Sequence, residues 1–158
     1  DMGLRELDRI LPEEKTILAQ YMSEYPVRIG QLAKDLGVTI RVSSMPTGVS
    51  GQISLEGNNY VIRVNRNEAR ERQRFNIIDS SPDGITDTVL YRSGAPERIE
   101  FEANRLAAEI VMPMHLIEKE LRENFGGLVT EATIEGLASS FEVSKAAMEI
   151  KLSTLVEA

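Results

Sequence analysis

The sequence contains no cysteine and, in 158 residues, a single histidine, His115. The lack of cysteine excludes disulfide bonds and thiolate metal sites, and it fits a reducing compartment such as the cytoplasm. No apolar run reaches membrane-spanning length, and we expect no signal peptide. Basic residues are outnumbered, with 18 Lys and Arg against 25 Asp and Glu. The resulting net charge of -7 argues against nucleic-acid binding as the main function.

Aromatic residues are also scarce, with four Tyr, four Phe and no Trp. Hydrophobic residues make up 42% of the chain and charged residues 27%, and the chain is long enough to bury a core. This composition predicts one soluble, helix-rich globular domain, or one domain with a small appendage.

Apolar residues three and four positions apart predict helices along most of the chain. We expect one or two helices within residues 4–22, and a short helix from Ile29 that ends at Gly37. Further helices are expected over residues 68–75, with Asn67 as cap, and over 96–111, 116–123 and 137–155, with a break at 126–127. Residues 77–84, rich in Asp, Ser, Pro and Gly, predict a loop.

Alternating apolar and polar residues predict strands over 38–42, 52–55 and 60–64. The last two should pair as an antiparallel hairpin, because Gly57, Asn58 and Asn59 tolerate the backbone angles of a tight turn. The outer strand of this hairpin could offer its edge to an extended peptide.

Two segments carry charged side chains in a regular pattern. Arg70, Arg72 and Arg74 recur on the predicted helix of residues 68–75, which favours a solvated helix face over an anion-binding patch. Glu100 and Asn104 are four residues apart on the next helix and therefore share a face. By itself this second pattern favours an ordinary solvated edge over a ligand pair.

The chain resembles the ImmA/IrrE family of metallopeptidase-like proteins over about residues 26–155. Five blocks in the family's order carry the resemblance: residues 29–37 (IGQLAKDLG), the hairpin of 51–54 and 60–65, residues 72–75 (RQRF), residues 90–93 (LYRS), and residues 100–113 (EFEANRLAAEIVMP). The resemblance implies a minimal zincin-like fold. It also implies that Glu100 is a zinc ligand and that Asn104 supports this ligand without touching the metal.

The family's His-Glu-x-x-His helix, which follows the Arg-Phe pair, is absent from this sequence. In the family its two histidines hold zinc together with the acidic residue, and its glutamate acts as the general base. Here Phe75 is followed directly by Asn76-Ile77-Ile78-Asp79. Zinc is expected for the intact family site, but not for a chain with this sequence, and the catalytic residues are unknown.

Two explanations of the missing helix stay open at this point. One is that residues between Phe75 and Asn76 are missing from the sequence, which predicts a discontinuity between these two positions. The loss of a central helix would uncover both of its neighbours at a cost exceeding a domain's marginal stability of about 5–15 kcal/mol, so this explanation is favoured. The other is a natural or engineered deletion that leaves a catalytically inactive relative.

Two features near the C-terminus have ordinary structural interpretations. His115 follows Pro113 at the start of a helix, so we expect a surface histidine and not a ligand. Residues 137–152 have the apolar rhythm of a helix-turn-helix, with Ser144 as cap of its second helix. The second helix offers only Lys145 and Lys151 as basic residues, which favours packing against the rest of the protein over DNA recognition.

The sequence therefore predicts an α+β fold, with a small, mostly antiparallel sheet flanked by helices. We expect a zincin-like domain over residues 1–125 and a helical region over 126–158. The resemblance implies a cytoplasmic zinc-dependent endopeptidase that acts on a partner transcriptional regulator, in stress response or mobile-element control. The alternative is an inactive peptidase-like module that binds such a regulator without cutting it.

Overall fold

The computed structural model describes residues 10–49, 51–78 and 100–156. At residues 51, 53, 55, 100–104 and 156 it describes the backbone alone. The predicted helix before residue 10, most of the predicted loop of residues 77–84 and the apolar stretch at 89–91 lie outside the described residues. No helix within the described ranges is long and apolar enough to cross a membrane.

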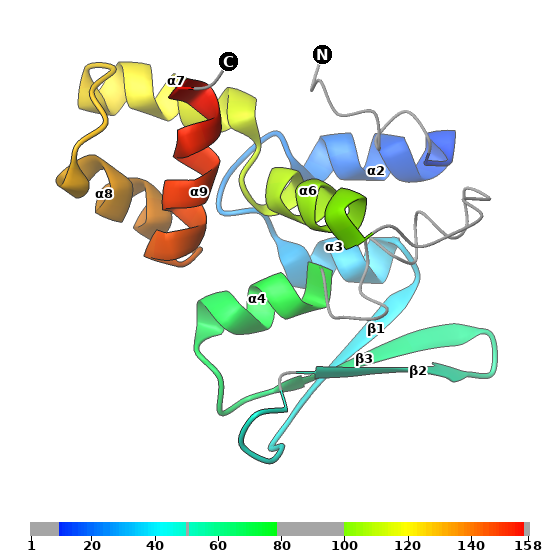
Figure 1. The fold of residues 1–158 in the computed structure, drawn as a ribbon. Helices are drawn as coiled ribbons and strands as arrows, with labels where there is room; N and C mark the ends of the chain where they lie inside the picture. The colour runs from blue at the N-terminus through cyan, green and yellow to red at the C-terminus, as the bar shows by residue number, and fades with distance from the viewer. Residues whose placement is uncertain (1–9, 50, 79–99, 157–158) are drawn as a thin grey trace.

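A short sheet lies along one side of the molecule, with helices stacked on one of its faces (Figure 1). The sheet contains β1 (Val38–Ser43), β2 (Gly51–Glu56) and β3 (Asn59–Asn65), in the order β1-β3-β2. β2 and β3 pair antiparallel, from Gly51 opposite Val64 to Glu56 opposite Asn59, which confirms the predicted hairpin. Gly57 has a φ of 64° in its turn, an angle that glycine adopts at little cost.

The arrangement of β1 corrects the prediction of a mostly antiparallel sheet. β1 runs parallel to β3, with Val38 opposite Tyr60 and Ser43 opposite Asn65, so the sheet is mixed. The α+β class is correct. The error has a simple source: a tight turn fixes β2 against β3, whereas β1 reaches β3 through a long connection whose direction no local signal specifies.

The two faces of the sheet differ in polarity, as strand alternation requires. Ile62 and Val64 of β3 are fully buried and belong to the hydrophobic core. On the opposite face, Arg63 donates to Ser54 Oγ at 3.3 Å and pairs with Glu56 at 3.3 Å. The helices therefore cover the face to which Ile62 and Val64 contribute.

The helices α2 (Pro12–Tyr21), α3 (Ile29–Asp35) and α4 (Arg70–Ile78) precede the gap in the described chain. α3 ends as predicted, because Gly37 follows with a φ of 80° that few other residues tolerate. α3 and α4 lie next to the sheet, and α6 (Glu100–Val111) lies beyond them (Figure 1). α4 begins two residues later than predicted, and Asn67 does not cap it. Instead the Asn67 amide donates to Ser44 Oγ at 2.9 Å.

The C-terminal part consists of α7 (Met114–Phe125), α8 (Glu131–Phe141) and α9 (Lys145–Val156). The predicted break after α7 is confirmed, with Gly126 in the left-handed conformation. The single helix predicted over 137–155 is instead two helices, as the helix-turn-helix rhythm indicated. Ser144 caps α9 by accepting a hydrogen bond from the Ala147 amide at 3.1 Å. The division into domains at residue 125 remains a prediction.

Asn65 organises the loop between β1 and β2. It is 3% exposed, and its Oδ1 accepts hydrogen bonds from the amides of Met45 at 3.1 Å and Asn67 at 3.0 Å. Its Nδ2 donates to the Val49 carbonyl at 2.8 Å. Because buried backbone groups need partners, this one side chain replaces a regular hydrogen-bonding pattern for the loop.

Candidate functional site

α4 passes through the position at which the missing active-site helix was expected. The helix is continuous over Arg70–Ile78, so the predicted discontinuity between Phe75 and Asn76 is wrong. Asn76, Ile77 and Ile78 are all buried, and Ile78 is fully enclosed. The apolar pair continues the helical period by one more turn, which explains why α4 extends into the residues predicted to form a loop.

The buried Asn76 is the polar exception on this turn. It is 5% exposed, and its Nδ2 has no hydrogen-bond acceptor within the part of the chain that is described. An unpaired buried amide of this kind costs about 1–3 kcal/mol. The core beside the end of α4 is therefore not optimised for stability at this residue.

α6 contains the motif that suggested a metal ligand. Glu100 is its first residue, and Asn104 lies one turn further on the same helix. The side chains of residues 100–104 are outside the described part of the structure. Their predicted roles in zinc binding, and the predicted orientation of Glu100 towards a concave space, stay predictions.

Glu109, in the same motif, has a structural role that the sequence did not reveal. Glu109 is only 3% exposed, and its Oε1 accepts a hydrogen bond from Lys151 Nζ of α9 at 2.5 Å. Oε2 accepts from the Met114 amide at 3.2 Å, where Pro113 gives α7 no side-chain cap. Glu109 thus joins three helices, and its partner is 42 residues away in the chain.

The three arginines of α4 have different environments, so the prediction of a solvated face is only partly correct. Arg70 and Arg72 are exposed, whereas the Arg74 side chain is only 11% exposed. Arg74 donates from Nε to the Glu142 carbonyl at 3.2 Å and pairs with the Glu142 carboxylate at 3.5 Å. Arg70 pairs with the same carboxylate at 3.2 Å. Burial lowers the pKa of Arg74, and the charge of Glu142 partly opposes this effect.

Glu142 itself occupies the turn between α8 and α9. Its φ of 54° is uncommon for a residue other than glycine, and two arginines stabilise its side chain there. Nearby, the Phe141 ring stacks on Tyr25 with centroids 4.4 Å apart. The turn is therefore attached to α4 by charge and to the N-terminal segment by ring contact.

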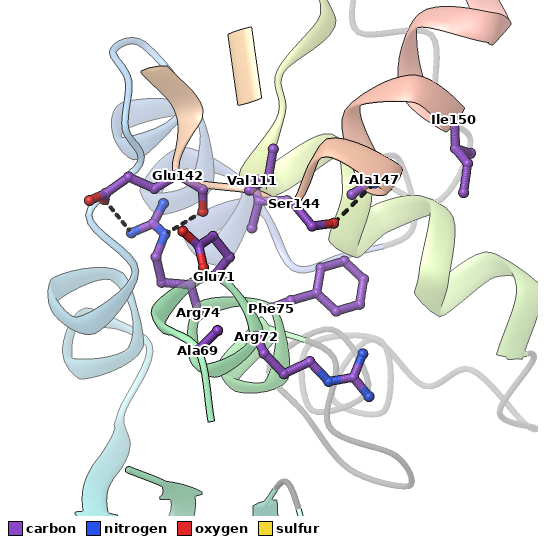
Figure 2. Close-up of a pocket in the computed structure, with 11 residues that line it drawn as sticks. Ala69, Glu71, Arg72, Arg74, Phe75, Val111, Glu142, Ser144, Ala147 and Ile150 are labelled. Carbon is purple, nitrogen blue, oxygen red and sulfur yellow. Dashed lines mark hydrogen bonds and ion pairs between the residues drawn. The ribbon is translucent and has the colours of Figure 1, made fainter. Parts of the chain in front are cut away.

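A pocket of about 350 Å³ opens between α4 and this turn (Figure 2). The polar groups that line it are Glu71, Arg72, Arg74, Glu142 and Ser144, and its apolar lining comes from Ala69, Phe75, Val111, Val143, Ala147 and Ile150. Its volume is at the lower end of the range of about 300–1,000 Å³ that is typical of small-molecule sites. Sequence patterns could not reveal it, because its walls come from segments about 70 residues apart.

His115 is exposed on the first turn of α7, as predicted, and does not line this pocket. No group of three or more His, Cys, Asp or Glu side chains that could hold a metal occurs among the described residues. The sequence has one histidine, so it cannot supply the two imidazoles of the family's zinc site. The residue set therefore does not fit that metal centre.

A comparison with protein families finds a match to the C-terminal part of the chain. Residues 82–153 match the model of the IrrE N-terminal-like domain, which defines a family of peptidases. The match confirms the resemblance to the ImmA/IrrE family. The matched region spans α6, α7, α8 and most of α9. A comparison with curated proteins finds no match.

Proposed function

We propose that this chain is a peptidase-like regulatory module that binds a partner transcriptional regulator in the cytoplasm without hydrolysing it. The observation that carries the proposal is the residue set, in which Phe75 is followed directly by Asn76 and no His-Glu-x-x-His occurs. In the family, the metal-binding helix begins at this point, whereas here Asn76, Ile77 and Ile78 are core residues. A polypeptide with His115 as its only histidine can retain the family's shape but not its zinc chemistry.

The sheet supports binding of an extended segment. Among the described strands, β2 pairs only with β3, so its outer edge is free of a strand partner. Such an edge presents backbone N–H and C=O groups that an incoming strand can pair with. We therefore propose that the regulator adds a strand along residues 51–56, with the side chains that point away from the core contributing to specificity.

A zinc-dependent endopeptidase is the second candidate. It is favoured by the family match and by the position of Glu100 at the start of α6. It requires residues between Phe75 and Asn76 that carry the two histidines and the general base. The two candidates therefore differ in which residue follows Phe75 in the natural protein.

Tandem mass spectrometry of a tryptic digest of the natural protein separates the candidates. Trypsin should release a peptide that begins at Phe75 and ends at Arg92, with Phe75 bonded directly to Asn76. A peptide in which Phe75 is followed by additional residues that contain His-Glu-x-x-His would refute the non-hydrolytic proposal. This measurement does not depend on where the natural chain begins or ends.

The binding part of the proposal is tested with the regulator that co-purifies with the chain. We expect a stable complex in size-exclusion chromatography, and intact regulator by mass spectrometry after prolonged incubation with added Zn²⁺. Amides of residues 51–56 should become protected from hydrogen exchange in the complex, while those of β1 serve as an internal control. The Glu100→Gln variant should bind equally well. Chelator-sensitive cleavage that this variant abolishes would instead establish the peptidase.

A further inference from the structure

The pocket beside α4 has a composition that selects a particular kind of ligand. Its apolar lining includes Phe75 from α4 and, across the pocket, Ala147 and Ile150 from α9 (Figure 2). Ile150 is 70% exposed, so it offers apolar surface to a ligand in the pocket. Covering these side chains would remove apolar surface from water, which favours binding of an apolar group.

The charged side chains at one end of the pocket form ion pairs, whereas the arginine at the other end forms none with a described residue. Arg70 and Arg74 both pair with Glu142, and Arg74 also donates to backbone carbonyl oxygens. The charge of Glu71 acts on Arg74 as well. Figure 2 shows Arg72 extending away from this group, on the side of Phe75. Arg72 is exposed and has no ion-pair or hydrogen-bond partner among the described residues.

An uncommitted guanidinium next to an apolar wall complements a molecule with an apolar body and one carboxylate. Arginine suits this role because its planar group can bind a carboxylate through two parallel hydrogen bonds. A ligand without the acid would leave Arg72 to water, and a ligand without the apolar part would leave Phe75 and Ile150 uncovered. Each half of the ligand therefore has its own partner on the protein.

We propose that this pocket binds a small amphipathic monocarboxylate, with its apolar body against Phe75, Ala147 and Ile150 and its carboxylate on Arg72. The pocket is lined by α4 on one side and by α9 and the α8–α9 turn on the other. A bound ligand contacts both sides and so stabilises their packing. This inference goes beyond the proposed function, because it requires no partner protein.

The test is a ¹H–¹⁵N NMR titration of the full chain with 4-phenylbutyrate and, separately, with octanoate. We expect saturable shifts confined to the residues that line the pocket, and a rise in the melting temperature at saturation. The uncharged analogue 4-phenylbutanamide should bind at the same place but up to about fivefold more weakly, as expected for loss of one exposed ion pair. Equal affinity for the acid and the amide would overturn the role of the carboxylate.

Variants then assign each half of the ligand. Arg72→Gln should remove the difference between 4-phenylbutyrate and its amide, whereas Arg122→Gln, which changes an exposed arginine of α7 outside the pocket, should preserve it. Ala147→Leu should fill the pocket and abolish binding of both compounds. Ile150→Ser weakens both without touching the core, since Ile150 is exposed. Shifts at residues outside the pocket, or shifts that persist in both Ala147→Leu and Ile150→Ser, would overturn the site. Neither result depends on whether the regulator binds.

Discussion

The buried ion pair between Glu109 and Lys151 allows a quantitative prediction about how α9 is attached to α6. The two side chains are 4% and 10% exposed, and their charged atoms are 2.5 Å apart. Replacing Lys151 by Met keeps most of the aliphatic volume but leaves the Glu109 carboxylate buried without its cation. Loss of one partner of a buried pair costs about 3–5 kcal/mol.

We expect a value near the lower limit of that range, about 3 kcal/mol, because Glu109 keeps its hydrogen bond from the Met114 amide. For a chain of this size, such a loss corresponds to a melting temperature lower by about 6–12 °C. Urea denaturation followed by circular dichroism measures the free energy of unfolding, and an unchanged m-value shows that the same surface unfolds.

Two further variants make the interpretation specific. Lys145→Met removes a cation from the same helix, but its partners Glu131 and Glu135 are well exposed, so the loss should stay below about 1 kcal/mol. The double change Glu109→Gln with Lys151→Met removes both buried charges and should recover most of the stability lost in Lys151→Met. If Lys151→Met costs no more than Lys145→Met, or if the double variant is less stable than Lys151→Met, the reasoning about this pair is wrong.

Three other predictions concern single side chains. Asn65→Ala should lower the free energy of unfolding by about 2–3 kcal/mol, since several backbone groups of the loop lose their partner; unchanged urea midpoints would contradict the role given to Asn65. The hydrogen bond to Glu120 raises the pKa of Tyr25 to about 12, so stability from this pair should be present below pH 10 and decline as the pH rises towards 12. Absorbance titration at the phenolate band should show Tyr25 ionising earlier in Glu120→Gln, and an unshifted curve would refute the assignment. Thr130→Ala should lower the free energy of unfolding by about 1 kcal/mol, because Thr130 Oγ1 caps α8 by accepting a hydrogen bond from the Thr133 amide at 3.2 Å. Calorimetry measures this loss, and the control Thr130→Ser, which keeps the hydroxyl, should have a stability near that of the wild type.

Features set by neighbouring residues were predictable from the sequence. The β2–β3 hairpin follows from alternation around Gly57, and the ends of α3 and α7 follow from Gly37 and Gly126. The cap of α9 by Ser144 was also recognisable. Each of these depends on contacts within a few positions along the chain, which is the range over which propensity and capping act.

Features set by distant partners were not predictable. The parallel pairing of β1 with β3, the burial of Arg74 against Glu142 and the ion pair of Glu109 all join segments far apart in sequence. A charged residue in a helical pattern gives no sign of whether its face meets water or another helix. The candidate pocket depends on the same long-range packing, so no pattern in the sequence pointed to it.

The mixed sheet also sets an order in which the strands can assemble. β2 and β3 are joined by a two-residue turn, whereas Val38 and Tyr60 are roughly twenty residues apart, so closing the β1–β3 pairing costs more chain entropy. The hairpin should therefore form first, and β1 should add to it once β3 is in place. On this view, weakening the hairpin slows folding, while weakening β1 mainly speeds unfolding. The edge strand proposed to meet the regulator would then belong to the earliest-formed part of the sheet.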